Sequence, residues 1–253
     1  MTRAILAPLV LLGLLLGGWE AACRLMEVPT YFLPPPSAVF TSLAAKGPLL
    51  LSSAWKTFST ALMSLAVASA IACTLALTAA LSRTLEQAFR PLAVAMQVTP
   101  VVALAPLFQV WAGVEHPETA VIALTVVVAF FPIYSGAVSG LKASDPDLER
   151  LFDLYGATPL QRLVRLRIPS AVPFLLEGHK VSVGLALVGA VVAEFAAGAG
   201  GSQGLAWRIL EASHELKTAD MMAALLVLAL MGAVLHAVFA TLERRALTWW
   251  RGR

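Results

Sequence analysis

The chain has 253 residues, of which 59% are apolar and only 13% charged, and its formal net charge is +3. A soluble domain carries about 25% charged residues. The few charges here cannot cover a water-facing surface, so the composition excludes a soluble globular enzyme, a disordered chain and a disulfide-built scaffold. The apolar excess predicts an integral membrane protein, and the small net charge gives no reason to expect nucleic acid as a partner.

Six segments are long and apolar enough to cross a bilayer, since a spanning helix needs about 20 predominantly apolar residues. In chain order they are Ile5–Cys23, Thr60–Leu81, Pro91–Trp111, Thr119–Leu141, Val181–Ala197 and Met221–Leu242. The first imitates a secretory signal peptide, but it is too long and lacks a small-residue cleavage site, so we expect an uncleaved span. The predicted fold class is all-α: a polytopic membrane protein with about six transmembrane helices, in a single domain over 1–253 with its core at 57–242.

The distribution of Lys and Arg predicts the orientation of these spans. With the N-terminus inside the cell, the inner segments hold 13 of the 18 basic residues and the outer segments hold 5. Cytoplasmic loops carry an excess of basic residues, so we expect a multi-pass protein with both termini in the cytoplasm.

The outer segment 24–59 contains three consecutive prolines, Pro34–Pro36, which forbid a helix at that point. Ser37 directly follows them and is a suitable N-cap residue. We therefore expect a short helix over Ser37–Leu51, separate from the span that follows it and lying on the outer surface.

The inner segment 142–180 differs from the other connections because it carries six basic and five acidic residues. Its pattern predicts a helix, a break and a second helix. Ser144 or Asp145 can cap the first helix, Gly156 interrupts the pattern, and Thr158 begins the second helix. We expect Pro169 and Pro173 to end the second helix, and its apolar face to consist of Leu160, Leu163, Val164 and Leu166.

Two functions suit such a hairpin. It can rest on anionic lipid headgroups as a basic amphipathic element, or it can dock a cytoplasmic partner. The glycine break and the balancing acidic residues are not needed for lipid binding, but the residues alone leave both possibilities open.

Several polar residues lie within the predicted spans. Pro100 and Pro106 break the hydrogen-bond ladder of the third span, and irregular backbone at this depth is tolerated where protein or water satisfies it. With Gln97, Thr99 and Gln109 nearby, this span is a candidate wall of a translocation path, or else it has a packing kink.

Glu194 in the fifth span is a second candidate, because a buried acid in a membrane is a functional hypothesis by default. It can also serve as a structural anchor that pairs with Arg208. His236 in the sixth span can relay protons or pack with a hydrogen bond. The Gly-rich segment 198–204 lacks the spacing of a nucleotide-binding fingerprint and is expected to be an outer-gate or re-entrant loop.

The hairpin resembles a known family. Gly156-Ala157, followed at the expected spacing by Leu166-Arg167-Ile168-Pro169, resembles the cytoplasmic loop motif of ABC importer permeases. Thr99–Leu107, Phe130–Ile133 and Leu242–Arg245 are similar to the nitrate/sulfonate/taurine group of these permeases, and Val188–Phe195 to the branch for thiamine-pyrimidine precursors. One departure is that Arg150-Leu151-Phe152 replaces the motif's Glu-Ala-Ala, with Glu149 one position early.

The resemblance implies a type I ABC importer permease in a bacterial inner membrane, which carries a small organic solute by alternating access. The solute would be a thiamine-pyrimidine precursor, a sulfonate or taurine, or a nitrate-like anion. Implied partners are a second permease copy, two cytoplasmic ATPase subunits, a periplasmic or lipid-anchored binding protein and membrane lipid. The chain itself would not be an enzyme and would hold no metal or cofactor, because ATP and Mg²⁺ are used by the ATPase. No Walker motif is present in the sequence.

The implied ATPase-coupling residues are Arg150, Leu151, Phe152, Tyr155, Gly156, Ala157, Pro159, Ile168 and Pro169. The candidate translocation-path residues are Gln97, Thr99, Pro100, Gln109 and Glu194. The alternative function is a self-contained, proton-coupled secondary transporter with Glu194 or His236 as its proton site.

Overall fold

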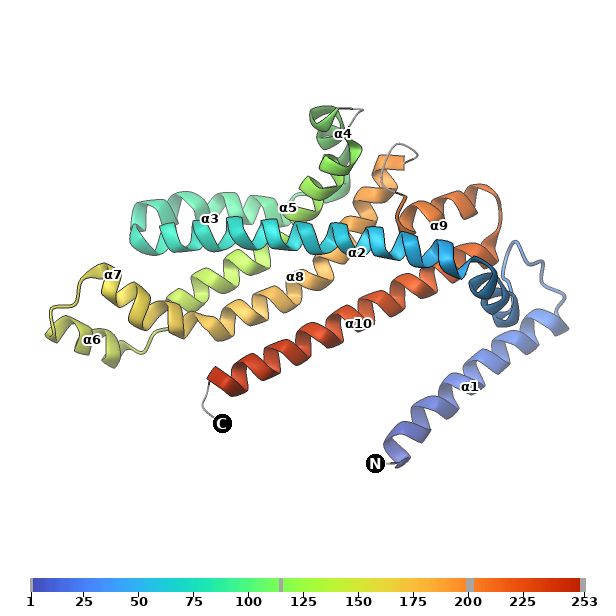
Figure 1. Cartoon of the computed structure of the whole chain (residues 1–253), viewed down its shortest axis with the longest axis horizontal. Helices are drawn as coiled ribbons and strands as arrows, with labels where there is room; N and C mark the ends of the chain where they lie inside the picture. The colour runs from blue at the N-terminus through green and yellow to red at the C-terminus, as the bar shows by residue number, and fades with distance from the viewer. Residues whose placement is uncertain (1, 114–115, 199–202, 251–253) are drawn as a thin grey trace. The chain divides into compact units, whose positions relative to one another are not determined.

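The computed structural model describes residues 2–113, 116–198 and 203–250, in which every regular element is a helix (Figure 1). The helices are α1 (Thr2–Leu25), α2 (Pro36–Leu81), α3 (Arg83–Val98), α4 (Val101–Ala112), α5 (Pro117–Leu141), α6 (Pro146–Leu154), α7 (Pro159–Arg162), the π-helix η1 (Leu163–Arg167), α8 (Ile168–Ala197), α9 (Leu205–His214) and α10 (Thr218–Trp250). Among the described residues, four helical stretches are long and apolar enough to cross a membrane, and a fifth counts if the bent pair α3 and α4 forms one span. The expected first span lies within α1.

The outer helix and the second span are one element. The expectation of a separate helix over Ser37–Leu51 is wrong, because α2 runs without interruption from Pro36 to Leu81 and includes Pro48. The polar residues that look like a connection in the sequence have partners inside the fold. Ser53, for example, is buried and accepts a hydrogen bond from Arg208 at 3.1 Å.

The predicted third span is broken at Pro100. α3 ends at Val98, α4 begins at Val101, and the two helices meet at 106°. The physical reason is the restriction that a proline places on the preceding residue, which disfavours the helical conformation. Thr99 accordingly has extended dihedrals, φ −72° and ψ 126°.

The second helix of the hairpin does not end at its prolines. α7, η1 and α8 follow one another to Ala197, with Pro169 in the first turn of α8 and Pro173 inside it. In η1 the backbone N–H of Ile168 reaches the carbonyl of Leu163, five residues back. This wider turn lets the chain enter α8 with a proline where the missing N–H would have no helical partner.

The chain divides into two compact units. The smaller unit comprises residues 1–56 and 203–230, and the larger unit comprises 57–202 and 231–253. In the smaller unit, Glu20 of α1 accepts hydrogen bonds from the backbone and hydroxyl of Ser37, and Asp220 of α10 accepts from Ser42 and Lys46. These bonds fasten its helices at their polar ends.

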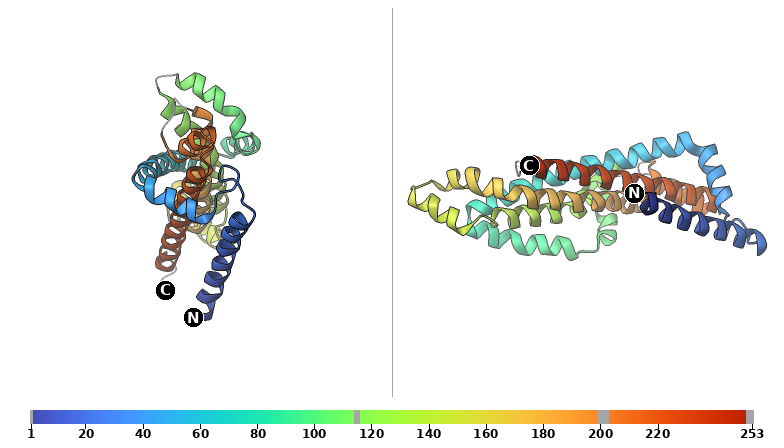
Figure 2. Two further views of the ribbon diagram at one scale, coloured as in Figure 1. Left: turned by 90° about the vertical axis from the view of Figure 1, so that its right-hand side faces the viewer. Right: turned by 90° about the horizontal axis from the view of Figure 1, so that it is seen from below.

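The larger unit is built on the pair α5 and α8, which run side by side (Figures 1 and 2). Their close approach depends on glycines. A Cβ on Gly136 would lie 2.7 Å from the carbonyl oxygen of Phe174, and one on Gly178 would lie 2.6 Å from that of Pro132. Small residues let helix backbones approach in a membrane, where van der Waals packing replaces the hydrophobic drive.

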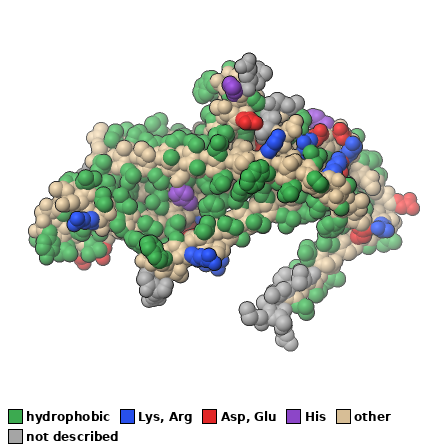
Figure 3. Space-filling view, in the orientation of Figure 1, with side chains coloured by type: hydrophobic (Ala, Val, Ile, Leu, Met, Phe, Trp, Pro, Cys, Tyr) green, Lys and Arg blue, Asp and Glu red, His purple; other side chains and the backbone are tan. Residues whose placement is uncertain are grey.

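Alanine dominates the rest of this core. Ala68 and Ala72 of α2, Ala129 of α5 and Ala190 of α8 are fully buried. Ser182 adds a hydrogen bond from its hydroxyl to the carbonyl of Ala129 at 2.7 Å. Large apolar side chains instead cover much of the surface along the long helices, as the space-filling view shows (Figure 3). This inversion suits a protein whose surroundings are lipid.

Candidate functional site

The hairpin at one end of the α5–α8 pair has two arms (Figure 1). The first arm is α6. Asp145 caps it by accepting a hydrogen bond from the backbone N–H of Asp147 at 2.8 Å, and Pro146 occupies its first turn. It ends at Tyr155, after which Gly156 has φ +62°, a left-handed conformation that glycine adopts without strain.

The second arm is formed by α7 and η1. Thr158 begins it with a capping box: its hydroxyl accepts from the N–H of Gln161, and the Gln161 side chain accepts from the N–H of Thr158. The expectation that Leu160, Leu163, Val164 and Leu166 share one face is wrong. Leu163 and Leu166 are buried, whereas Leu160 and Val164 are exposed, because the π turn alters the helical register.

Glu149 of α6 links the two arms. Its carboxylate accepts from Arg167 Nε at 2.9 Å and from Ser144 Oγ at 2.7 Å, and it lies 3.4 Å from Arg162 Nη1. Arg162 also pairs with Asp153. Burial would raise the pKa of Glu149, but the hydrogen bonds from Arg167 and Ser144, together with the charges of Arg167 and Arg162, lower it below its ordinary value of 4.5.

The tip of the hairpin presents apolar side chains to solvent. Leu154 is 84% exposed and Tyr155 is 83% exposed. Further exposed apolar side chains on the two arms are Leu148, Leu151, Leu160 and Val164. Exposed apolar groups on a polar element are typical of a protein–protein contact.

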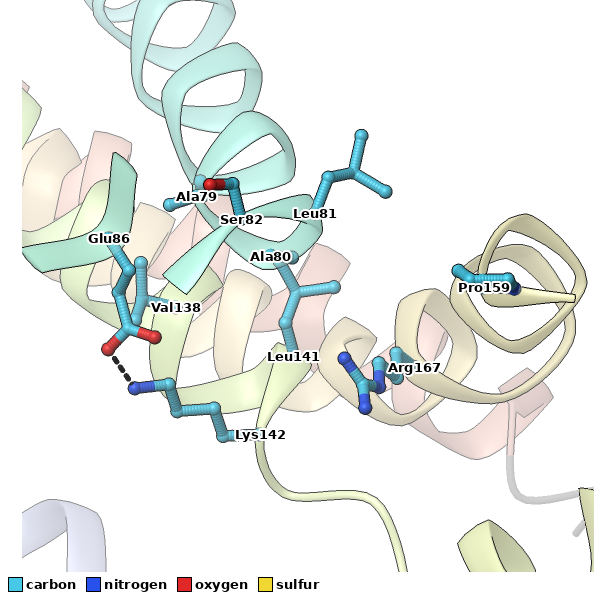
Figure 4. Close-up of a pocket in the computed structure, with 11 residues that line it drawn as sticks. Ala79, Ala80, Leu81, Ser82, Glu86, Val138, Leu141, Lys142, Pro159 and Arg167 are labelled. Carbon is cyan, nitrogen blue, oxygen red and sulfur yellow. Dashed lines mark hydrogen bonds and ion pairs between the residues drawn. The ribbon is translucent and has the colours of Figure 1, made fainter. Parts of the chain in front are cut away.

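A groove of about 390 Å³ lies between the hairpin and the bundle (Figure 4). The turn from α2 to α3 forms one side of it, the end of α5 another, and Pro159 and Arg167 the hairpin side. Lys142, which ends α5, forms an ion pair with Glu86 in the first turn of α3. An ion pair that belongs to the fold therefore forms part of the groove lining.

The structure places most of the predicted coupling residues around the Gly156 turn. Arg150, Leu151, Tyr155 and Pro159 are exposed. Arg150 pairs with Asp147 of its own helix at 2.9 Å. The other predicted residues, Phe152, Ala157, Ile168 and Pro169, are partly buried.

The predicted path residues fall in separate places. Gln97 is exposed, and the Thr99 hydroxyl bonds to the carbonyl of Ala95 in its own helix, beside Pro100 at the bend. Gln109 donates to the carbonyl of Ala196 in the last turn of α8. Glu194, in that same turn, is 1% exposed and accepts a hydrogen bond from Thr57 of α2 at 2.9 Å.

Arg208, the candidate partner of Glu194, forms an ion pair with Glu211 at 2.8 Å. His236, the candidate proton relay, is exposed. Most of the Gly-rich segment 198–204 lies outside the described residues, so the expectation of a gate loop there stays a prediction.

Sequence reasoning missed several contacts. His179 bonds through Nδ1 to the carbonyl of Leu175 at 2.7 Å and through Nε2 to Ser69 Oγ at 2.8 Å. A carbonyl only accepts, so this geometry places a proton on Nδ1. Lys180 of α8 pairs with Glu243 of α10 at 3.0 Å. Ser69 lies 110 residues from His179, and Lys180 and Glu243 are likewise far apart in the chain, so no local sequence signal joins either pair.

Comparison with known proteins identifies the family. Residues 68–247 match the family described as the inner membrane component of binding-protein-dependent transport systems. The chain belongs to this family. It is 31% identical over 245 residues to the formylaminopyrimidine transport permease protein ThiX of Halalkalibacterium halodurans, covering 96% of each chain. It is 35% identical to the riboflavin transport system permease protein RibX of Chloroflexus aurantiacus, covering 95% of this chain and 88% of that one.

The taurine permease TauC of Escherichia coli is 27% identical, with 100% of this chain and 92% of that one covered. These relatives confirm the resemblance to the sulfonate, taurine and nitrate group and to its thiamine-pyrimidine branch. The solved structure of an amino acid ABC transporter superposes with a TM-score of 0.67 at 14% identity, covering 81% of this chain and 98% of that chain. The predicted all-α, polytopic ABC permease fold is thereby confirmed, and the relatives are transport subunits.

Proposed function

We propose that this permease forms the translocation path of an ATP-driven importer for a small organic solute and works by alternating access. It would pair with a second copy, two cytoplasmic ATPase subunits and a periplasmic or lipid-anchored binding protein. The observation that carries this proposal is the hairpin 142–180. Its two capped arms meet at a left-handed Gly156 and present exposed apolar side chains outside the bundle.

The hairpin suits a lever between two states of the transporter. Its second arm continues directly into α8, and α8 packs closely on α5 through their glycines. A push on the arms would therefore move a packed helix pair, which shifts between discrete arrangements rather than bending continuously. This side of the membrane would be the cytoplasm, as the distribution of basic residues predicts, and both termini would lie on the same side.

A pyrimidine-like heterocycle is the substrate class that we favour within the family. ThiX, at 31% identity, and RibX, at 35%, are named for a formylaminopyrimidine and for riboflavin. The relatives named for taurine and aliphatic sulfonates are 26% to 29% identical.

Transport in proteoliposomes tests the proposal. The permease is reconstituted with the ATPase and the binding protein encoded nearest to it, and uptake of radiolabelled formylaminopyrimidine, riboflavin and taurine is measured with and without internal ATP. Uptake should require ATP, the ATPase and the binding protein. Accumulation by the permease alone under a pH gradient, abolished in Glu194→Gln, would instead establish the proton-coupled alternative.

A further inference from the structure

We infer that Glu149 is a positioning residue. Its carboxylate holds the two arms of the hairpin at a set angle and thereby preorganises the surface that binds the ATPase. The binding of the ATPase rests on the proposed function, whereas the positioning of the arms concerns the permease chain alone.

The first arm has little else to hold it. None of the residues of α6, all of which the structure describes, is buried. A Cβ on Gly156 at the turn would meet no described atom within 4 Å, so packing does not fix the turn either. Phe152 is partly buried, but no side chain of α6 is enclosed in the core, so its charge pairs with the second arm are left to set its position.

Glu149 is placed to provide this connection. Its side chain is 20% exposed, it accepts hydrogen bonds from Arg167 and Ser144, and the Arg162 guanidinium lies 3.4 Å from it. Hydrogen bonds between ionised partners are about twice as strong as neutral ones, and shielding from water strengthens them. Because the carboxylate is on the first arm and both guanidinium groups are on the second, these contacts restrict the motion of one arm relative to the other.

The π turn makes this sharing possible. Arg162 and Arg167 are five residues apart, which in an α-helix would point them about 140° away from each other. The five-residue bonds of η1 bring such positions close to one side of the helix. Both guanidinium groups can therefore reach one carboxylate.

The residue next to Glu149 on α6, Arg150, faces the solvent. Arg150 has a side chain that is 77% exposed, and its partner Asp147 is 84% exposed on the same helix. A step of one residue along α6 thus turns a side chain from the solvent toward the second arm. The acid at 149, one position before the motif, faces the second arm. Asp147 offers a matched control with the same charge on the same helix.

The experiment compares Glu149→Gln with Asp147→Asn in the full-length permease in lipid nanodiscs. Hydrogen exchange of the α6 amides should become about tenfold faster in Glu149→Gln and stay unchanged in Asp147→Asn. Arg167→Gln should act like Glu149→Gln, and the double variant should add little to either, since the two residues share one interaction. Arg167→Gln tests the same contact if Glu149→Gln does not fold.

The second readout is a titration of the permease with the purified ATPase encoded nearest to it. The ATPase concentration at half-saturation should rise about tenfold in Glu149→Gln, because the hairpin is no longer preorganised for binding. The ATP turnover at saturation should stay near the wild-type value, because the substitution removes no contact with the ATPase. A general folding defect would instead lower the turnover at saturation.

Each outcome is decisive. Unchanged exchange in Glu149→Gln overturns the positioning role. Faster exchange with an unchanged half-saturation overturns the link to the ATPase. If the wild-type permease does not bind the ATPase at all, the proposed function fails, whereas the exchange data still decide whether Glu149 positions the arms.

Discussion

The hydroxyl of Thr57 on α2 donates a hydrogen bond to the carboxylate of Glu194 on α8 over 2.9 Å, and both side chains are almost completely withdrawn from the surface. A carboxylate buried in a membrane protein requires such donors, because leaving it unsatisfied costs more than the bond itself contributes. The contact joins two long helices, α2 and α8, within the larger unit. Any role of Glu194 in transport would therefore be combined with this structural one.

Thr57→Val should lower the free energy of unfolding by about 1–3 kcal/mol, because it leaves an acceptor of Glu194 without this donor at nearly constant side-chain volume. Thr74→Val on the same helix is the control, since the exposed Thr74 hydroxyl donates to the carbonyl of Ala70 in its own helix. Thermal unfolding of the purified protein in detergent measures both. Equal stability of the two variants would contradict the importance of the contact.

Gly178→Ala should destabilise the α5–α8 pair by about 1–3 kcal/mol, because the added Cβ would overlap the backbone at Pro132 and force the helices apart. Gly184→Ala in the same helix meets no described atom within 4 Å and should be neutral or stabilising by up to about 1 kcal/mol. The difference between the two melting temperatures is the measurement. A harmless Gly178→Ala would show that the helices are not held at this separation.

Gly156 should tolerate asparagine but not valine. Its φ of +62° lies in the left-handed region, which asparagine enters readily and β-branched residues do not. Because the space around it is open, the cost of valine is backbone strain of about 1–2 kcal/mol rather than a clash. We expect Gly156→Val to remain in the membrane with reduced ATP-dependent uptake, and Gly156→Asn to transport like wild type. Full uptake by Gly156→Val would refute the lever at this turn.

The order of the hairpin should depend on acid pH through Glu149. Its pKa is lower in the folded hairpin than its ordinary value of 4.5, so its contribution to stability is fully present above 4.5 and is lost as the pH falls through the lowered value. Limited proteolysis of the hairpin, compared with Glu149→Gln at each pH, separates this effect from the pH dependence of the protease. Wild type should be better protected at pH 6, and the two proteins should converge only once the pH has fallen below the lowered pKa of Glu149. Parallel curves over the whole range would contradict the assignment.

Much of the architecture could be predicted because apolar composition and length act locally. The spans predicted at Thr119–Leu141 and Met221–Leu242 lie within α5 and α10, and the two arms of the hairpin begin where Asp145 and Thr158 predicted them. Capping depends on a side chain and the backbone two or three residues away, so a short stretch of sequence contains the whole interaction.

The prolines show where this local reasoning stops. Pro100 bends the predicted third span by 106°, whereas Pro48, Pro169 and Pro173 lie within continuous helix. Each proline lacks the same N–H, so the difference comes from its surroundings. A π turn or neighbouring helices can compensate for the missing bond at one site and not at another.

The sequence by itself determined the membrane setting, the helical class, the family and the hairpin with its glycine turn, because composition, caps and motif spacing are properties of short segments. Only the tertiary structure decided which charges meet. The shared contact of Glu149 with Arg162 and Arg167 requires the π turn, and that of Glu194 with Thr57 joins residues 137 positions apart. Such contacts depend on how whole helices pack. Glu149, Arg167 and Glu194 could therefore be named from the sequence, but their partners could not.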